Sequence, residues 1–253
     1  MNAAGMKAIY AFEMARARRP WWQSLVAPVI TTSLYFLVFG TAIGSRMSAM
    51  NGVDYGSFIV PGLIMLSVLT QSIFNASFGI YFPKFTGTIY ETLSAPISPF
   101  EITLAYVGAA TTKACVLALV TLATAALLVD VRIAHPLLML VFLVTISAGF
   151  CLLGFAIGIW AKSFEQLQVV PLLVVTPLTF LGGVFYSVEA LGEPFRTVTH
   201  LNPILYLVSG FRWTFFDTAD VPLAASIAVM AGAILIPLAA IAWIFRTGYR
   251  LKN

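Results

Sequence analysis

The chain has 253 residues, of which 60% are hydrophobic and only 9% are charged, whereas soluble domains carry roughly 45–50% apolar and about 25% charged residues. This composition excludes a soluble domain and indicates an integral membrane protein. The net charge of +4 is small and dispersed, so we expect no nucleic acid partner. Cys115 and Cys151 both lie in apolar runs, which predicts no disulfide framework.

The segment before the first apolar run is interpreted as an interfacial helix that ends near Arg19. Met6, Ile9 and Tyr10 share one face of this helix, as expected for a segment that lies on a membrane. Glu13 lies on the same face and makes the amphipathic pattern imperfect.

A spanning helix needs about 20 apolar residues, because it rises 1.5 Å per residue across roughly 30 Å of hydrocarbon. Six segments are long enough, at approximately 23–44, 57–80, 102–129, 137–161, 168–187 and 223–245. The side of the N-terminus holds Lys7, Arg16, Arg18, Arg19, Lys84, Lys162, Arg246, Arg250 and Lys252, and the opposite side holds Arg46, Arg132, Arg196 and Arg212. This bias predicts that both termini are cytoplasmic.

The connection at residues 81–101 predicts a short amphipathic helix at the cytoplasmic surface, over approximately 83–96. Phe85, Ile89 and Leu93 recur on one helical face between two prolines. The residues from Ser98 to Glu101 then form a start signal for the third span, with Ser98 as cap, Pro99 at the first position and Glu101 completing a capping box. The short helix either rests on lipid headgroups or docks a soluble partner.

The external connection predicts a re-entrant helical hairpin at approximately 188–216. Residues 188–198 and 201–216 are apolar, yet each is far shorter than a span. Asn202 followed by Pro203 is typical of a helix cap and first helical residue. An amphipathic cap on the outer surface of the bundle is an equally good reading of this pattern.

Several motifs in chain order carry a family resemblance. They are YGSFIVPG at 55–62, GTIYETLSAPISP at 87–99, KSFEQ at 162–166, PLTFLGGVFYS at 177–187 and NPILY at 202–206, ending at Arg212. Essentially the whole chain resembles the permease subunit of a type 2 ABC exporter, in the family of drug, nodulation-factor and polysaccharide export permeases. One departure is visible: Gly192 and Glu193 precede Pro194 after Leu191, where the family usually has proline at once.

The resemblance implies a dimer of this chain working with two ATPase subunits. The chain has no phosphate loop of the form G-x-x-x-x-G-K-[ST], so ATP and magnesium are expected on the partner subunit and no cofactor or metal on this chain. The helix at 83–96 then resembles a coupling helix that contacts the ATPase. The residues expected at that contact are Thr88, Tyr90 and Glu91, with Lys162 and Glu165 as a lesser contact.

The family places the transport path between two copies of the chain, along the second and fifth spans. The candidate lining residues are Gln71, Phe74, Asn75 and Phe78 on the second span, and Thr176, Thr179, Phe180 and Phe185 on the fifth. Aromatic lining with a few amides suits an amphipathic or lipid-like substrate, and the family transports small molecules, lipids or glycans. For each aromatic residue, ordinary helix packing is the competing interpretation.

Small residues in the spans have two predicted roles. Gly182 and Gly183 end the fifth span and are the candidate hinge of a gate, together with Asn202 and Pro203 in the external hairpin. The G-x-x-x-G pair at 154 and 158 permits close helix approach, which we assign to packing within the chain.

Lys113 is the ionisable residue that lies well inside a predicted span. Such a residue is a candidate for function. The third predicted segment is longer than a bilayer requires, however, so its start can lie at the interface and Lys113 can extend to water. We favour this second interpretation.

Catalytic patterns are absent from the sequence. No histidine lies inside a predicted span, which argues against an intramembrane serine protease. An ion-coupled secondary transporter usually carries intramembrane acids and often internal repeats, and the predicted spans contain neither. A channel stays possible in principle, although the crosswise cytoplasmic helix has no evident role in one. We therefore predict a permease of the bacterial inner membrane, with an ATP-independent channel or secondary transporter as the alternative.

Overall fold

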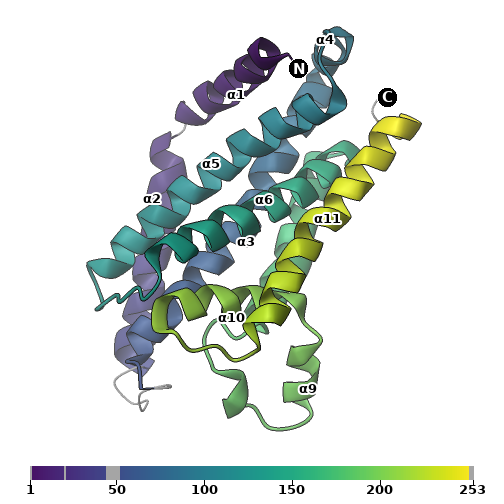
Figure 1. The fold of residues 1–253 in the computed structure, drawn as a ribbon. Helices are drawn as coiled ribbons and strands as arrows, with labels where there is room; N and C mark the ends of the chain where they lie inside the picture. Colours follow the sequence, from purple (N-terminus) through teal and green to yellow (C-terminus); the bar gives the residue numbers. More distant parts are fainter. Residues whose placement is uncertain (1, 20, 44–51, 251–253) are drawn as a thin grey trace.

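The computed structural model describes residues 2–19, 21–43 and 52–250. The regular elements of this part are helical, and the long ones form one bundle (Figure 1). In chain order they are α1 (Ala3–Arg18), α2 (Trp21–Tyr35), the π-helix η1 (Phe36–Ile43), α3 (Tyr55–Thr86), α4 (Ile89–Ser94), α5 (Pro99–Ala126), α6 (Pro136–Trp160), α7 (Phe164–Val169), the π-helix η3 (Val170–Val175), α8 (Thr176–Phe180), the 3-10 turn η4 (Val188–Ala190), α9 (Phe195–His200), α10 (Pro203–Phe216) and α11 (Leu223–Thr247).

Four helices of the described chain are long and apolar enough to cross a membrane, namely α3, α5, α6 and α11. Two further apolar helical stretches, Val26–Gly40 and Phe164–Phe180, are shorter and correspond to the first and fifth predicted spans. The chain is thus an all-helical protein with several apolar helices, and the count of six spans stays a prediction. Part of the first predicted span, residue 44, lies outside the described residues.

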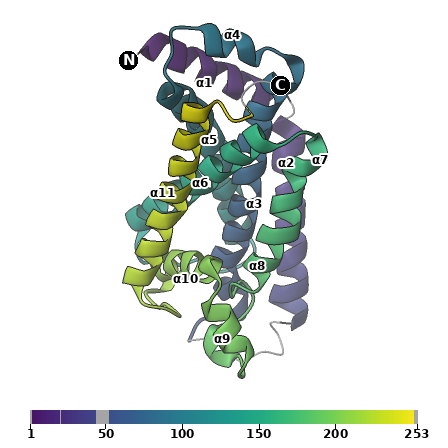
Figure 2. The same cartoon turned by 90° about the vertical axis from the view of Figure 1, so that its right-hand side faces the viewer.

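The two ends of the bundle differ in shape (Figure 2). At one end α1 and α4 lie across the long helices, and the C-terminal end of α11 is close to them. At the other end lie α9 and the start of α10. Both ends of the described chain therefore lie at the same end of the bundle, as an even number of crossings requires; the predicted orientation itself stays a prediction.

Helix α3 is the centre of the bundle and is buried over most of its length. It is apolar all round, which is typical of a helix enclosed by others. Gly154 and Gly158 on α6 face α3, where a Cβ at either position would collide with the carbonyl oxygen of Ile73 or Ser77. The prediction that this G-x-x-x-G serves packing within the chain is confirmed.

The predicted boundaries of the cytoplasmic helix are wrong. Pro83 does not begin a new helix but lies inside α3, which continues to Thr86 and ends at Gly87 with a left-handed φ of 82°. Only Ile89–Ser94 forms the separate helix α4, with Ile89 buried, while Phe85 is 63% exposed. The predicted start of α5 is confirmed, since the Ser98–Glu101 capping box and Pro99 at the first turn are all present.

The fifth predicted span, 168–187, is wrong at both ends. The helical stretch starts at Phe164 and ends at Phe180, and its middle third, from Val170 to Val175, is π-helical. At 1.5 Å per residue it is roughly 25 Å long, which is short of the roughly 30 Å hydrocarbon layer. Residues 181–187 form turns instead of helix. π-Helical segments often occur at functional sites.

The external connection differs from a simple pair of half-helices. The predicted first half, 188–198, is split into η4 and α9, with irregular chain between them. The second half is the single helix α10, which is mostly buried. Its predicted start is confirmed, because the Asn202 side chain accepts a hydrogen bond from the Ile204 N–H and Pro203 occupies the first turn.

Candidate functional site

A cavity of about 290 Å³ lies between α2, α3 and α8. Its wall mixes hydroxyls and hydrocarbon, from Ala27, Pro28, Thr31, Thr32, Tyr35, Leu63, Leu66, Ser67, Thr70, Gln71, Thr176 and Phe180. None of these residues is charged. Gln71 is half-buried in this wall, and its amide has no hydrogen-bond partner in the described chain. The cavity can therefore offer an unused amide and several hydroxyls to a neutral molecule.

The predicted path residues fall into two groups. Gln71, Thr176 and Phe180 line the cavity, and Asn75 lies one turn from Gln71, half-buried and also without a hydrogen-bond partner among the described residues. Thr179 is 0% exposed, and its hydroxyl donates to the Val175 carbonyl at 2.6 Å. Thr179 is therefore packed inside the chain and does not face the cavity.

The remaining predicted path residues belong to two separate aromatic clusters. Phe185 packs against Phe39, with ring centroids 4.6 Å apart, and against Phe180 at 5.2 Å and Tyr35 at 6.0 Å. In the other cluster the Phe78 ring centre lies 6.0 Å from those of both Phe74 and Phe164. Phe185 therefore packs against the cavity residues Tyr35 and Phe180. Phe74 and Phe78 instead pack against each other, and Phe78 also packs against the start of α7.

Arg212 on α10 is the central residue of the outer end. It is 2% exposed, and its Nη1 donates to Asp220 Oδ2 at 2.8 Å. Its Nη2 donates to the carbonyl oxygen of Gly183, and its guanidinium carbon lies 4.0 Å from the centre of the Phe58 ring on α3. One buried side chain thus joins α10, the turn after α8, α3 and the connection to α11.

Asp220 extends this network. Its Oδ1 accepts a hydrogen bond from the Ser187 hydroxyl at 2.7 Å, while its backbone N–H donates to Ser209 on α10 at 2.9 Å. Buried ionised groups are tolerated when they are paired and hydrogen-bonded. The Arg212–Asp220 pair and its hydrogen bonds therefore hold the outer end in one arrangement, which we call the Arg212 network.

The candidate hinge residues are all held in place. Gly183 has φ 78° and its carbonyl accepts a hydrogen bond from Arg212, and a Cβ at Gly182 would lie tightly, 3.1 Å from two backbone oxygens. Asn202 donates from its side chain to the Leu178 carbonyl at 2.5 Å, while Pro203 is exposed. Tyr186 donates to the Leu181 carbonyl at 3.0 Å, and burial raises the pKa of its phenol above 10.0, which keeps this donor protonated. A hinge motion here must break these hydrogen bonds.

At the opposite end, an ion-pair cluster joins α1 to α5. The carboxylate of Glu13 is 2% exposed and contacts Arg16 at 2.7 Å and Lys113 at 3.3 Å. The favoured interpretation of Lys113 is wrong, because this side chain pairs with Glu13 instead of extending to water. This pair also explains why Glu13 interrupts the apolar face of α1. Its carboxylate binds the ammonium group of Lys113, which lies inside the third predicted span.

Lys84, one of the charges on the side of the N-terminus, is buried in the structure. It is 8% exposed, and its Nζ donates to the carbonyl oxygens of Ile159 at 2.7 Å and Ala161 at 3.4 Å. A cation at the last carbonyls of α6 is favourable because the C-terminus of a helix carries partial negative charge. Lys84 therefore fixes the end of α3 against the junction of α6 and α7.

The predicted coupling residues lie at this same end of the molecule. Thr88, Tyr90 and Glu91 are exposed on or beside α4, with Tyr90 46% exposed. Lys162 and Glu165 are exposed at the start of α7, where the Lys162 backbone N–H donates to the Gln166 side chain at 2.8 Å. These residues are available to a partner, whereas the buried Ile89 anchors α4 to the bundle.

Substitution of Glu13 by glutamine is expected to loosen the contact of α1 with α5. The variant loses charged hydrogen bonds, each of which contributes about 1.5–3 kcal/mol, and leaves Lys113 without its carboxylate. Trypsin cleavage after Arg18, which is exposed, should become faster. Lys7→Gln, which changes an exposed charge on the same helix, is the control, and equal cleavage rates in the two variants would contradict the ion-pair assignment.

Sequence reasoning missed Asp220 and the partnership of Glu13 with Lys113. Both cations indicated in the sequence that a carboxylate partner exists, because a charge in or near an apolar segment must be paired when it is buried. Asp220 follows Arg212 by eight residues, within local reach. Glu13 and Lys113 are 100 residues apart, so this pair required the packing of α1 on α5 to be known. In the part of the chain described, no group of three His, Cys, Asp or Glu residues is placed to hold a metal ion.

Comparison with known proteins agrees with the geometry. The structure combines long apolar helices, an uncharged cavity and an interrupted fifth segment. The model of the ABC-2 type transporter family matches residues 5–216. The chain is 40% identical over 225 residues to the inner membrane transport permease YadH of Escherichia coli K12, covering 89% of this chain and 88% of the relative.

More distant relatives carry another name. Nodulation protein J of Neorhizobium galegae is 26% identical over 195 residues, covering 75% of this chain and 72% of the relative. Nodulation protein J of Rhizobium leguminosarum bv. viciae is 24% identical over 216 residues, or 85% and 82%. The chain belongs to the ABC-2 type transporter family and is a transmembrane component of an ABC transporter, a multi-pass protein of the inner membrane.

Proposed function

We propose that this chain forms, as a dimer, the substrate pathway of an ATP-driven exporter and works with two separate ATPase subunits. The observation that carries this proposal is the position of α4. This short helix lies across the end of the bundle (Figure 2) and presents Tyr90 and Glu91 to solvent. Its buried Ile89 and the capping box at the start of α5 connect it firmly to two long helices.

Movement of α4 can be transmitted to the cavity through α3. The chain passes directly from the end of α3 through Gly87 into α4, and α3 also carries Gln71 in the cavity wall. Lys84 couples the same end of α3 to α6. When the ATPase subunits close on ATP, we propose that they push α4 and rock the two bundles toward each other. The cavity is then compressed.

The outward step of this cycle requires the Arg212 network to open. The turn at 181–187 and the external segment from η4 to α10 cover the outer end of α8, and we propose that they act as a lid. The cavity wall is uncharged and mixes hydroxyls, an amide and hydrocarbon. This chemistry supports a neutral or amphipathic substrate, among the small molecules, lipids and glycans that the family transports.

The test is the variant Glu91→Ala, assayed as the complete transporter with its ATPase in proteoliposomes. Loss of one charged hydrogen bond at the contact, about 1.5–3 kcal/mol, is expected to lower transport and its coupling to ATP hydrolysis by roughly tenfold or more. Membrane insertion should be unchanged, because Glu91 is exposed. The control is Asp130→Ala, an exposed acid in the connection between α5 and α6, outside the proposed lid and away from α4.

Normal coupling in Glu91→Ala would contradict the docking role of α4. If no ATPase copurifies with the wild-type chain from its native membrane, the ATP-driven mechanism itself fails. The ATP-independent channel or secondary transporter would then be the reading to test.

A further inference from the structure

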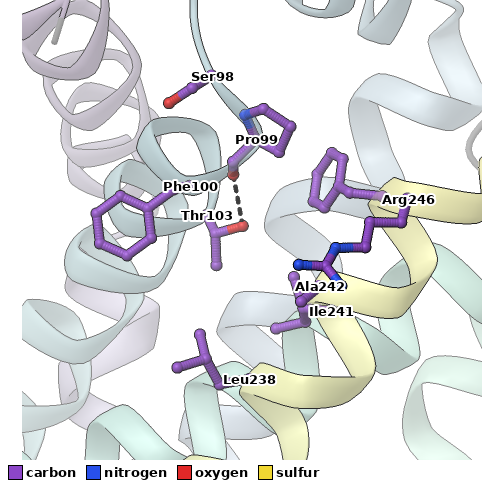
Figure 3. Close-up of a pocket in the computed structure, with 9 residues that line it drawn as sticks. Ser98, Pro99, Phe100, Thr103, Leu238, Ile241, Ala242 and Arg246 are labelled. Atoms are coloured by element: carbon purple, nitrogen blue, oxygen red, sulfur yellow. Dashed lines mark hydrogen bonds between the residues drawn. The ribbon is translucent and has the colours of Figure 1, made fainter.

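A second cavity lies away from the proposed pathway, between the start of α5 and the last turns of α11 (Figure 3). Its volume is about 340 Å³. The residues that line it are Ser98, Pro99, Phe100, Thr103, Leu238, Ile241, Ala242, Phe245 and Arg246. We call this space the α5–α11 groove. From Leu238 to Arg246 it follows α11 for roughly 12 Å.

The polar side chains of the two walls already have partners, with one exception. The Ser98 hydroxyl donates to Glu101 at 2.8 Å, and the Thr103 hydroxyl donates to the Pro99 carbonyl at 2.8 Å. Pro99 has no backbone N–H to offer. Apart from Arg246, the groove therefore presents hydrocarbon to whatever fills it.

Arg246 is the exception. It is exposed and makes no hydrogen bond or ion pair with any residue of 2–19, 21–43 or 52–250. In Figure 3 its side chain extends along α11 and its guanidinium lies beside Ala242, on the side of α11 that faces α5. Arg250, one turn further on, is different: it donates to the Trp160 carbonyl at 2.8 Å and lies 5.5 Å from that ring. An unpaired guanidinium is well suited to bind phosphate in two parallel hydrogen bonds.

The surroundings indicate which kind of phosphate is available. Helix α11 also carries exposed apolar side chains outside the groove, with Leu235 62%, Ile236 73% and Trp243 55% exposed. Such a surface on a membrane-spanning helix faces lipid. Arg246 lies in the last turn of α11, and this end of α11 lies at the same end of the bundle as α1 and α4 (Figure 2). In the proposed membrane position, lipid headgroups lie at this depth.

We propose that the α5–α11 groove binds one anionic phospholipid, with an acyl chain along the hydrocarbon walls and its phosphate on Arg246. The apolar walls match the chain and the unpaired cation matches the headgroup charge, so both parts of the ligand have a counterpart. The site is separate from the cavity at Gln71, and the proposal does not depend on the ATPase partner. The proposal predicts a lipid that stays bound to the protein and is not the transported substrate.

The first part of the test concerns the headgroup. Native mass spectrometry of the full chain in detergent measures how much lipid stays bound to the protein. Phosphatidylglycerol and phosphatidylcholine with identical acyl chains are the probes. Wild-type protein is expected to retain phosphatidylglycerol preferentially. Arg246→Gln should lower that retention about fivefold, the effect of one basic side chain near a membrane surface, and remove the preference. Lys7→Gln, an exposed cation on α1 that does not line the groove, should behave as wild type.

The acyl arm uses Ala242→Phe, which places a ring in the groove and leaves Arg246 unchanged. Exclusion of two or more methylenes should lower retention of both lipids about tenfold. The proposal would be overturned if Arg246→Gln still preferred phosphatidylglycerol. It would also be overturned if inorganic phosphate displaced the bound lipid as effectively as added phosphatidylglycerol does. If Ala242→Phe converts dimer to monomer without loss of lipid, the groove holds a second copy of the chain and the proposal is wrong.

Discussion

Replacement of Arg212 by methionine is expected to lower the free energy of unfolding by about 3–5 kcal/mol, the usual effect of breaking a buried ion pair by removing one partner. The side chain of Asp220 is 3% exposed, so its charge cannot be solvated once the guanidinium is gone. The Gly183 carbonyl also loses its donor. The turn after α8 should therefore detach from α10, and the outer end of the bundle should open first.

Thermal unfolding in detergent measures this effect, and limited proteolysis within 183–200 locates it. The double variant Arg212→Met with Asp220→Leu should recover part of the lost stability, because replacing both partners of a buried pair by apolar groups is often nearly neutral. Arg196→Met, which removes an exposed arginine of α9 at the same end, is the control. Equal melting temperatures for Arg212→Met and Arg196→Met would show that the network does not hold the outer end.

Replacement of Gly158 by leucine is expected to prevent α6 from packing on α3. A Cβ at this position would collide with the Ser77 carbonyl oxygen and lie 2.5 Å from Ile80 Cγ2 and 2.9 Å from Ser77 Cα. Overpacking of a core costs about 1–3 kcal/mol and occasionally more. We expect at least about 3 kcal/mol here, because two of the obstructing atoms belong to the backbone of α3 and cannot change rotamer.

Gly232→Leu provides a matched control for this substitution. Gly232 also lies in a long apolar helix, α11, but a Cβ there would meet only Ile236 Cδ1 at 4.0 Å. The two variants therefore add the same side chain to helices of similar composition. Size-exclusion chromatography and thermal unfolding should show an aggregated or strongly destabilised Gly158→Leu protein and a normal Gly232→Leu protein. Equal behaviour would contradict close packing of α6 on α3.

Features that depend on neighbouring residues were predictable from the sequence. The caps at Ser98 and Asn202 form because a side-chain oxygen meets an N–H two or three residues later, a contact within one turn of the chain. Pro83 was misleading for a related reason. Proline predicts a helix boundary because it removes a helical hydrogen bond. In a membrane helix, however, the surroundings can satisfy the freed carbonyl, and α3 continues to Thr86.

The sequence by itself determined the class of protein, the order of its apolar segments and the positions of its main connections, because hydrocarbon demands long apolar helices and polar turns between them. Only the tertiary structure decided which charges are buried and with which partners. Lys84, Lys113 and Arg212 all appear in the sequence as isolated cations of an apolar chain. The partners of Lys84 and Lys113 lie on helices far apart in the chain, and such contacts arise from packing, which no local pattern records. Asp220 is only eight residues from Arg212, but the Gly183 carbonyl and the Phe58 ring reach Arg212 through packing alone.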